Sequence, residues 1–419
     1  MKNNPFSSDI FKGVWLKIFN EDKPHFNFPF FDEILFVKNN FLGVYCNVGR
    51  TNTKGISYST GRISPEIKKK CFLIFDVPEY FKIEPTQETT CLKLIKIKQY
   101  QGFLINTENQ ESIEKYLSSN FSKSSRYKLK KYKKKFEKCF KVDYKMFRGP
   151  MERQEYDILF DYFRELLEKR FDEKQITNNN LYPKEWEFYQ EVTYPMILEK
   201  KAGLFVIYDS GKPVGVTLNY FSNDILFDAI TVFDIEYSKF HLGSITIMKL
   251  IEWCIQNNFK SMDFSKGYFD YKKRWATNNY NFEYHIYYDH KSVTSTIKAT
   301  ILSIYFKLKQ TMREKHLNEK LHRLTYRLKN KKNVSKNDIR FQFLKNDDNK
   351  FERENFSSIH WESNESLKRQ LIFEFLYLFE ENKEYVKVFI HNSKENNYYI
   401  QGKSTGCFVI PLGNTQRSD

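Results

Sequence analysis

The chain has 419 residues, of which 41% are hydrophobic and 17% aromatic, and its formal net charge is +16. This composition excludes a disordered chain, and the low content of 15 glycines and 11 prolines excludes a fibrous or low-complexity one. The length allows two or three domains and a sizeable core. Every apolar run is too short to cross a bilayer, and the first residues lack a signal-peptide core, so we expect a cytoplasmic protein.

The positive charge is concentrated in two segments. Residues 123–148 hold twelve Lys and Arg against two acids, and residues 291–332 also hold twelve against two, which is a net charge of +10 in each. Both segments are predicted to be helical. Their charge predicts contact with something anionic: lipid headgroups, nucleic acid or a phosphorylated substrate.

In chain order, residues 1–110 are predicted to be rich in strands. Short runs of bulky and β-branched residues are bounded there by Asn, Gly, Pro or Ser. The runs are 14–19, 34–37, 41–45, 72–75, 92–97 and 102–105. No chemical motif occurs among them.

Residues 111–150 are predicted to form a basic bridging helix. Leu129, Tyr132, Phe136 and Phe140 recur every three or four positions, which indicates an amphipathic helix with a cationic face. That face is either an anion-binding surface or an ordinary solvated helix face, and the residues alone leave both interpretations open.

Residues 151–290 are predicted to form an α+β domain. Apolar stripes predict one helix from about Glu152 and another with Pro183 in its first turn. Bulky runs separated by turn residues then predict three antiparallel strands, a helix and a short return strand. The expected strands are 203–208, 214–221 and 226–237, the helix begins at 243–244, and the return strand is 261–264.

The last third is predicted to contain two further parts. In residues 291–332, apolar residues from Ile297 to Leu328 recur at near-3.5 spacing, which predicts basic amphipathic helices. This stripe either docks on the rest of the protein, which we favour, or lies flat on an anionic membrane. Residues 333–419 are predicted to be a small α+β appendage. Its expected strands are 339–344, 385–390, 398–400 and 407–410, and its expected helix is 367–379.

The order of four features in residues 203–276 resembles a known domain. They are the strand meander, the Gly-Ser helix start (Gly243, Ser244), the Asp-x-x-x-Gly turn (Asp263, Gly267) and the Tyr-Lys-x-x-Trp run (Tyr271, Lys272, Trp275). Together they resemble the BioF2-like or CelD-like acetyltransferase domain of the GNAT superfamily, which is related to the Fem aminoacyl transferases. The resemblance implies a GNAT-like mixed α+β sheet flanked by helices, in tandem, with a degenerate N-terminal half before the catalytic half.

The resemblance also implies acyl-CoA, with acetyl-CoA foremost, as the donor substrate. In the superfamily the pyrophosphate of this donor lies on backbone N–H groups at a helix start, where the helix dipole favours anions. Gly243 allows the backbone to approach closely, and Ser244 is expected to cap the helix. The loop keeps a single glycine where the superfamily pattern has Gly-x-Gly/Ala. The residues matched to this site are His241, Leu242, Gly243, Ser244 and Ile245.

The resemblance implies Asp263 and the pair Tyr271 and Lys272 as catalytic residues, and Asp228 is added from its place in an apolar strand. Asp263 either orients or deprotonates a substrate amine, or caps the loop that follows it. Asp228 is a second candidate base, because an acid inside an apolar strand is costly unless it is paired. Tyr271 and Lys272 are expected to bind a phosphate or to polarise the donor carbonyl.

Three residues complete the predicted site as substrate-binding residues. Arg126 matches the basic helix that bridges the two halves in the family, and Gly267 follows the Asp263 strand. Trp275 is the third, with packing as its alternative role. The six cysteines lie far apart without a C-x-x-C pair, so we expect neither a disulfide framework nor a metal site.

Three functions remain open at the level of the sequence. The first is transfer of an acyl group from acyl-CoA to an amine or hydroxyl of a cell-envelope or polysaccharide precursor. The second keeps the fold but takes the acyl group from aminoacyl-tRNA, which the basic helix would bind. The third is a non-catalytic scaffold on an anionic surface. The basic helices also predict peripheral contact with the inner face of a membrane.

Overall fold

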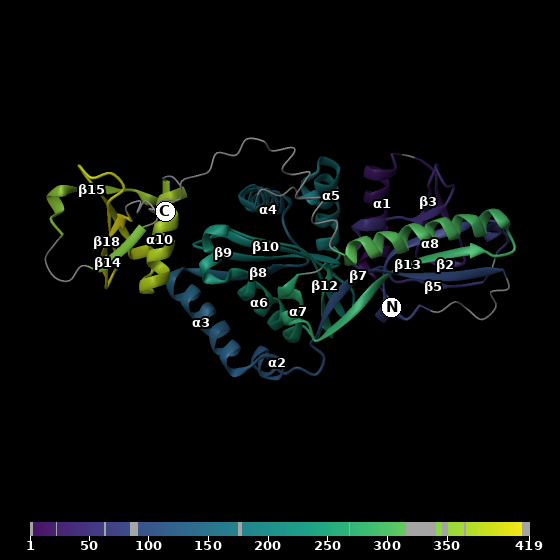
Figure 1. Cartoon of the computed structure of the whole chain (residues 1–419), viewed down its shortest axis with the longest axis horizontal. Coiled ribbons are helices and arrows are strands. Elements are labelled where there is room, and N and C mark those ends of the chain that lie inside the picture. The colour runs from purple at the N-terminus through teal and green to yellow at the C-terminus, as the bar shows by residue number, and fades with distance from the viewer. Residues whose placement is uncertain are drawn as a thin grey trace, which may run out of the picture.

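The structure, a computed structural model, describes residues 3–21, 23–62, 64–83, 91–174, 178–267, 269–315, 341–345, 351–363 and 366–412. An 11-stranded mixed sheet runs through the described residues up to Asp289, and a separate five-stranded antiparallel sheet lies near the C-terminus (Figure 1). The chain is therefore a mixed α+β protein with an extra C-terminal sheet.

The large sheet is built from strands that are distant in the sequence. In spatial order they are β1 (His25–Asn27), β3 (Leu35–Lys38), β4 (Tyr45–Asn47), β6 (Cys71–Pro78), β13 (Asn278–Asp289), β7 (Leu92–Asn106), β12 (Ser261–Lys266), β11 (Ile225–Phe233), β10 (Lys212–Phe221), β9 (Ala202–Asp209) and β8 (Val142–Phe147). The pairs β4–β6 and β11–β12 are parallel, and the other neighbours are antiparallel. A separate pair is formed by β2 (Phe31–Asp32) and β5 (Ser59–Thr60). The expected runs 92–97 and 102–105 belong to one strand, β7.

The strand order repeats about the middle of the sheet. In residues 25–78, β1, β3 and β4 are antiparallel and β6 returns parallel to β4. In residues 202–266, β9, β10 and β11 are antiparallel and β12 returns parallel to β11. The next strand of each set crosses over, because β7 pairs with β12 and β13 pairs with β6. Since each set contains a strand of the other, the domain boundary expected at residue 110 does not fall at a break in the sheet, whereas the one expected at 290 follows the last strand of the sheet. Both boundaries stay predictions.

Helices cover both faces of the second set of strands (Figure 1). The side chains of Leu204 and Val206 pack on the face that carries α4 and α5, and those of Phe205 and Ile207 pack on the face that carries α6. This alternation follows from the two-residue period of a strand. The helices of this part of the chain are α1 (Asp9–Trp15), α2 (Ile113–Asn120), α3 (Lys123–Cys139), α4 (Arg153–Lys174), α5 (Pro183–Leu198), α6 (Leu242–Gln256), α7 (Asp270–Trp275) and α8 (Val293–Glu314).

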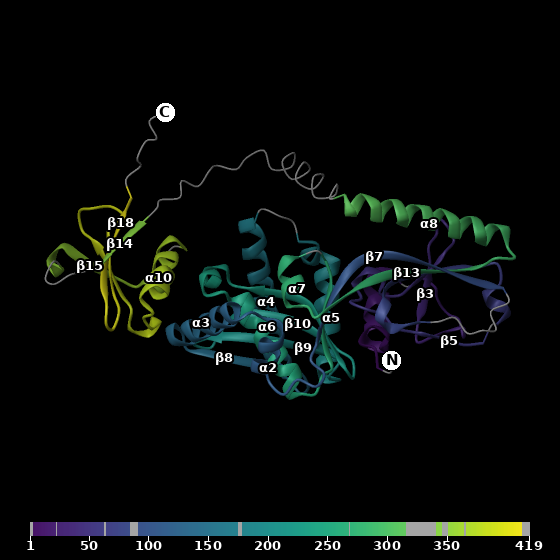
Figure 2. The ribbon, with the colours of Figure 1, turned by 60° about the horizontal axis from the view of Figure 1, so that its bottom comes forward.

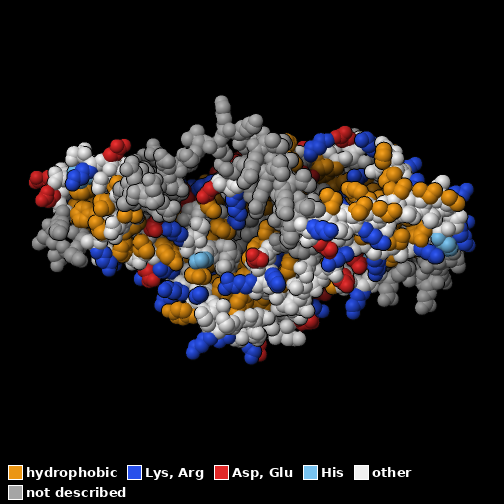
Figure 3. All heavy atoms as spheres, in the orientation of Figure 1, with side chains coloured by type: hydrophobic (Ala, Val, Ile, Leu, Met, Phe, Trp, Pro, Cys, Tyr) orange, Lys and Arg blue, Asp and Glu red, His pale blue; other side chains and the backbone are white. Residues whose placement is uncertain are grey.

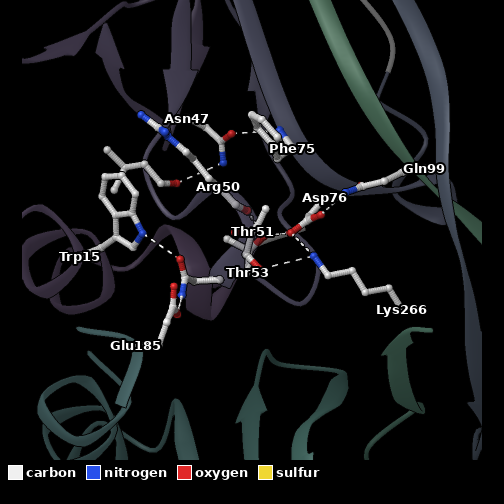
Figure 4. A network of polar contacts seen from close by, with 12 residues as sticks. Trp15, Asn47, Arg50, Thr51, Thr53, Phe75, Asp76, Gln99, Glu185 and Lys266 are labelled. Atoms are coloured by element: carbon white, nitrogen blue, oxygen red, sulfur yellow. Dashed lines mark hydrogen bonds and ion pairs between the residues drawn. The ribbon is translucent and has the colours of Figure 1, made fainter. Parts of the chain in front are cut away.

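A buried polar network joins the N-terminal strands to β12 (Figure 4). Asp76 of β6 is fully buried, and its Oδ2 lies 2.6 Å from Nζ of Lys266 at the end of β12. The same oxygen accepts a hydrogen bond from Oγ1 of Thr53 at 3.2 Å, and Oδ1 accepts one from Nε2 of Gln99 at 2.7 Å. Charge-assisted hydrogen bonds of this kind are stronger than neutral ones, so the network fixes how the two sets of strands meet.

The C-terminal unit packs against the basic helix α3. The ring of Phe373 lies 4.7 Å from that of Tyr237, and Nζ of Lys135 donates to the backbone carbonyl of Tyr377 at 2.8 Å. Lys135 and Lys138 both form ion pairs with Glu380, so this unit covers part of the cationic face of α3. The unit contains α10 (Ser366–Phe379) and, in spatial order, β14 (Phe341–Lys345), β18 (Gly406–Pro411), β17 (Tyr398–Gln401), β16 (Lys387–His391) and β15 (Phe356–Ile359).

The helix α8 lies across β13, β7 and β6 (Figure 2). Leu302 and Phe306 on its inner side are buried against Ile97 and Tyr284 of the sheet. The expected stripe itself lies on the outer side, where Ile297, Ile301 and Leu308 are exposed, so the expectation that it docks on the protein is wrong for this part of the chain. The rest of the stripe falls in residues 316–340, which lie outside the described residues. None of the helices in the described part of the chain is both long enough and apolar enough to span a bilayer.

Candidate functional site

The candidate site lies where two neighbouring strands of the large sheet separate. β11 and β12 are paired only over Ile225–Phe227 and Ser261–Asp263. Beyond Phe227, β11 continues along β10, and the register of that pair shifts at Leu218/Asn219. A bulge of this kind increases the local twist of a strand and is common beside functional sites. The expected third strand therefore ends at Phe233 rather than Tyr237, because Asp234 begins a 3₁₀ turn.

A cavity of about 310 Å³ occupies this opening. Its walls come from β11, the first turns of α6, α7 and the end of α4. It is lined by Arg170, Asp228, Thr231, Phe233, Ser238, His241, Gly243, Ser244, Thr246, Ile247, Leu250, Tyr271 and Trp275. Six of the residues that the sequence analysis selects are among them, namely Asp228, His241, Gly243, Ser244, Tyr271 and Trp275. Residues 40 to 50 positions apart in the chain thus meet in one cavity.

Two groups of opposite charge border the cavity. Asp228 is 9% exposed, its Oδ1 accepts a hydrogen bond from Oγ1 of Thr231 at 2.8 Å, and burial raises the pKa of its carboxyl. The guanidinium of Arg170 lies 4.4 Å from the ring centre of Phe233. Among the described residues, the buried Nη1 of Arg170 has no hydrogen-bond partner. The cavity therefore offers a carboxylate that can accept a proton and a cation that can bind an anionic group.

The start of α6 forms one wall. His241 has a left-handed backbone conformation with φ of 58° and occupies the N-cap position, so the expectation that Ser244 caps the helix is wrong. The backbone amides of Ser244 and Ile245 donate to the carbonyl of His241, at 2.9 Å and 3.2 Å. The first amides of a helix, here those of Leu242 and Gly243, point along its axis and favour an anion.

Gly243 lies close to the ring of Phe233, so a side chain at this position would be crowded. A Cβ there would lie 3.1 Å from the ring of Phe233, across the cavity. The ring of His241 stacks on that of Tyr132 with 3.7 Å between the ring centres. The side chains of Leu242 and Ile245 are fully buried in the core, so only their backbones contribute to this wall.

Asp263 lies outside the cavity lining. It is fully buried, and its oxygens accept hydrogen bonds from the hydroxyls of Tyr80 at 2.8 Å and Tyr280 at 2.6 Å and from the amide of Ser265 at 2.7 Å. Burial raises the pKa of its carboxyl to about 6, although these donors oppose the rise. The contact with Ser265 is the loop-capping alternative, and the role of Asp263 as a base stays a prediction.

Lys272 also lies behind the cavity rather than in it. Its Nζ donates to the carbonyl of Phe264 at 2.7 Å and to that of Lys266 at 3.0 Å, which closes the loop after β12. Burial lowers the pKa of this lysine to about 8, and the charges of Asp228 and Asp263 oppose the fall. In the structure its contacts hold Tyr271, the preceding residue of α7, at the cavity.

The other expected substrate-binding residues have separate positions. Arg126 donates from Nη1 to the carbonyls of Ser118 and Phe121, at 3.2 Å and 2.9 Å, and so closes the end of α2 away from the cavity. Gly267 lies in the loop after β12 with φ of 130°, a conformation that favours glycine. Trp275 is 2% exposed and packs in the core, and it also lines the cavity, so its role in substrate binding stays a prediction.

Arg170 and the two tyrosines that bind Asp263 are absent from the sequence-based selection. Arg170 falls on the apolar stripe of α4, seven residues after Phe163 and three after Leu167, both of which are buried. A charge on the buried side of an amphipathic helix is a usable signal. Tyr80 comes from a part of the chain 183 residues before Asp263, and no local pattern points to it.

Two further features of the described residues bear on the kind of site. A larger hollow of about 980 Å³ lies between the β9–β10 turn and the C-terminal sheet, and none of the selected residues lines it. Three of its charged groups bind one another, since Lys383 pairs with Asp209 and Glu362. In the described part of the chain, no group of three or more His, Cys, Asp or Glu side chains is arranged to hold a metal ion.

Comparison with known proteins identifies this region. Residues 123–273 match the family described as an acetyltransferase (GNAT) domain, which implies an acyl-CoA donor. No curated protein matches the chain. The residues present fit such a donor, because the start of α6 and the free Nη1 of Arg170 suit its phosphates and the cavity suits its reacting end.

Several solved structures have a distantly similar fold. A conserved protein of unknown function from Bacteroides thetaiotaomicron VPI-5482 is 9% identical, with 68% of this chain and 93% of that one covered at a TM-score of 0.44. L-PGS from Bacillus licheniformis is 11% identical, and the match covers 65% of this chain and 85% of that one with a TM-score of 0.40. FemX is 10% identical, and the match covers 60% of this chain and 83% of that one with a TM-score of 0.40.

Proposed function

We propose, from the acetyltransferase (GNAT) domain that residues 123–273 form, that this chain transfers an acyl group from acyl-CoA to an amine or a hydroxyl. The observation that carries the proposal is the cavity at which β11 leaves β12, because a carboxylate, a phenol and the start of α6 line it together. A base, a donor to the reacting carbonyl and an anion site are the parts that this transfer needs.

In this proposal Asp228 is the general base. The nitrogen or oxygen of the acceptor attacks the carbonyl carbon of the thioester, and its proton passes to the carboxylate of Asp228. The hydroxyl of Tyr271, which lines the cavity and is 45% exposed, donates a hydrogen bond to the carbonyl oxygen as charge develops there. The carbon–sulfur bond then breaks, and the coenzyme leaves as a thiolate that takes up a proton from solvent. The raised pKa of Asp228 suits a base that works near neutral pH.

Acetyl is the acyl group that the size of the cavity favours. Ligand pockets span roughly 300–1,000 Å³, and this one, at about 310 Å³, must hold both the acyl group and the reacting part of the acceptor. Arg170 provides one site for an anionic group of the coenzyme or of the acceptor. The acceptor class expected from the resemblance, a cell-envelope or polysaccharide precursor, stays a prediction.

The N-terminal strands are in this proposal a degenerate repeat of the catalytic half. Support comes from the repeated strand order and from what lies between the parallel pair. The second set has α6 between β11 and β12, whereas the described residues between β4 and β6 form only β5 and the short 3₁₀ turns Arg50–Asn52 and Pro65–Ile67. Without a longer helix at this place, the first set has no equivalent of the anion site at His241–Ser244.

An aminoacyl-tRNA donor is the alternative within the same fold. It would need the basic face of α3 to bind phosphates, and Lys135 and Lys138 on this face are paired with Glu380 of the C-terminal unit. These pairs reduce the charge that the face offers to a tRNA, while Lys130, Lys131 and Lys134 of the same helix are exposed. A scaffold without activity is the remaining alternative.

The proposal is tested by measuring free thiol released from acetyl-CoA in the presence of a panel of amines and hydroxyl compounds. The expected result is release that depends on an acceptor and falls when acetyl-CoA is replaced by longer acyl-CoAs. Turnover of aminoacyl-tRNA instead of acyl-CoA would support the alternative donor. Absence of turnover with every donor, in a protein that binds none of them, would support the scaffold.

A further inference from the structure

The helix α8 has apolar residues on two opposite sides. On the inner side, Ala299, Leu302 and Phe306 are buried against the sheet. A helix that only covers a sheet needs a single apolar stripe, with polar residues facing solvent. The composition of the outer side therefore needs a separate explanation.

The outer side carries a continuous stripe of large apolar side chains. They recur at three- and four-residue spacing along four turns, and each is between 44% and 60% exposed. They are Ile297, Ile301, Ile304, Tyr305, Leu308 and Met312. Figure 3 shows hydrophobic side chains gathered along α8 with basic side chains beside them. Contiguous exposed apolar surface of this kind marks an interaction site rather than ordinary surface.

Lysines flank this stripe on both sides. With 100° between successive residues of a helix, Lys298 and Lys309 fall along one edge of the stripe and Lys307 falls along the other. The acid at the end of α8, Glu314, lies 3.6 Å from Lys98 and so does not neutralise these edges. A lysine at such an edge can bury its methylene groups beside apolar surface while its ammonium reaches a phosphate.

An exposed phenylalanine extends the same surface. Phe41 is 93% exposed at the tip of the loop between β3 and β4. The carbonyl of Gly43 in that loop accepts a hydrogen bond from Nζ of Lys298 at 3.3 Å, which places the loop beside α8. The outer stripe of α8, its flanking lysines and Phe41 are called the α8 outer face below.

We propose that the α8 outer face binds the surface of an anionic lipid bilayer, with the helix lying in the plane of the headgroups. An apolar stripe between lysines is the pattern of helices that lie in this interface. Charge distinguishes this partner from a second copy of the chain, because two such faces brought together would place lysines against lysines. The attachment needs no spanning helix, and it does not depend on the proposed acyl transfer.

The test is sedimentation of the full chain with vesicles of phosphatidylcholine alone or mixed with phosphatidylglycerol. We expect binding to the mixed vesicles only. Ile301→Asp with Leu308→Asp should raise the lipid concentration for half-binding by about ten-fold or more, since two apolar side chains no longer enter the bilayer. The matched control, Ile158→Asp with Leu198→Asp, removes two equally exposed apolar side chains and adds the same charge, and should leave binding within about two-fold of wild type.

A second variant separates charge from apolar contact. Lys307→Gln with Lys309→Gln should weaken binding to the mixed vesicles while leaving the circular dichroism spectrum unchanged. Equal loss of binding in the two aspartate variants would overturn the proposal, because binding would then depend on net charge alone. Failure of the wild-type chain to bind mixed vesicles would also overturn it. A dimer that dissociates only in the Ile301/Leu308 variant would identify a second copy as the partner.

Discussion

Asp228 and Asp263 lie on neighbouring strands, one residue apart in register, yet their surroundings differ. Asp263 is enclosed by Tyr80, Tyr280 and the loop that it caps, whereas Asp228 borders a cavity and has Thr231 as a hydrogen-bond donor. A base must reach the proton that it removes. In the proposed function Asp228 is therefore the base, and Asp263 shapes the loop that it caps.

The proposed role of Asp228 as general base predicts that a substitution of nearly the same shape causes a large loss of activity. Asp228→Asn keeps the hydrogen bond from Thr231 but removes the base, so kcat for thiol release should fall by about 100-fold or more. The matched control is Asp224→Asn, in the turn before β11, where the carboxylate lies 3.8 Å from Nζ of Lys260 at the surface. This control should keep wild-type kcat. Similar kcat values for the two variants would remove Asp228 from the mechanism.

The burial of Asp263 predicts a pH dependence of stability. Its pKa rises from an ordinary 3.8 to about 6 in the folded chain, so the native state binds more protons than the unfolded state between these values. The contribution of Asp263 to the free energy of unfolding is therefore full below about pH 4 and is lost as the pH rises through 6. Relative to Asp263→Asn, the wild-type chain should gain up to about 3 kcal/mol between pH 7 and pH 4. Urea denaturation at several pH values measures the free energy of unfolding of both proteins. A difference between wild type and Asp263→Asn that does not change with pH would contradict the prediction.

At the scale of elements, the network around Asp76 links strands of the two halves of the large sheet, because Asp76 of β6 binds Lys266 of β12 (Figure 4). Asp76→Asn keeps the hydrogen-bonding shape but leaves the charge of Lys266 without its partner. Breaking a buried pair in this way costs about 3–5 kcal/mol, whereas an exposed pair contributes about 0–1 kcal/mol. Urea denaturation should therefore show a much larger loss for Asp76→Asn than for Asp224→Asn, which breaks the exposed pair with Lys260. Equal losses would show that the network does not stabilise the sheet.

The elements that the sequence predicts well are those with local signals. The three strands of the meander, the helix after them and the return strand follow from apolar runs and turn residues, and the structure contains each of them as β9, β10, β11, α6 and β12. Six of the selected site residues meet in one cavity for the same reason, because the selection came from this local order of motifs.

Long-range pairing lies beyond these signals. The exchange of β7 and β13 between the two sets depends on pairs such as Ser261 with Asn106 and Phe282 with Pro78, which are distant in the sequence, and a period-2 pattern does not specify a partner strand. The capping of α6 differs from expectation because a left-handed His241, rather than Ser244, takes the N-cap position. The resemblance points to Asp263, but the sequence around it does not show that Tyr80 and Tyr280 bind its carboxylate.

At the scale of the whole molecule, the described parts form a row. The C-terminal unit contacts α3 through α10 at one end, the cavity lies in the middle, and α8 covers the N-terminal strands at the other end (Figure 2). The cavity and the α8 outer face therefore belong to different halves of the large sheet. This separation allows the membrane proposal and the acyl-transfer proposal to be tested by variants that do not overlap.

The central claim is that the cavity beside α6 binds acyl-CoA, and thermal melting with acetyl-CoA, longer acyl-CoAs and free CoA tests it most directly. A ligand that binds only the folded state raises stability by about 2.7 kcal/mol at a hundred times its Kd. We predict a rise in Tm for the wild-type chain that is lost in Gly243→Trp, whose side chain would fill the cavity next to Phe233.

Gly13→Trp is the matched control, because a side chain at Gly13 meets no atom within 4 Å, and it should keep the wild-type response. The account predicts a clear shift for the wild-type and Gly13→Trp chains and none for Gly243→Trp. No shift with any of these ligands in the wild-type chain, or an equal shift in Gly243→Trp, would contradict it.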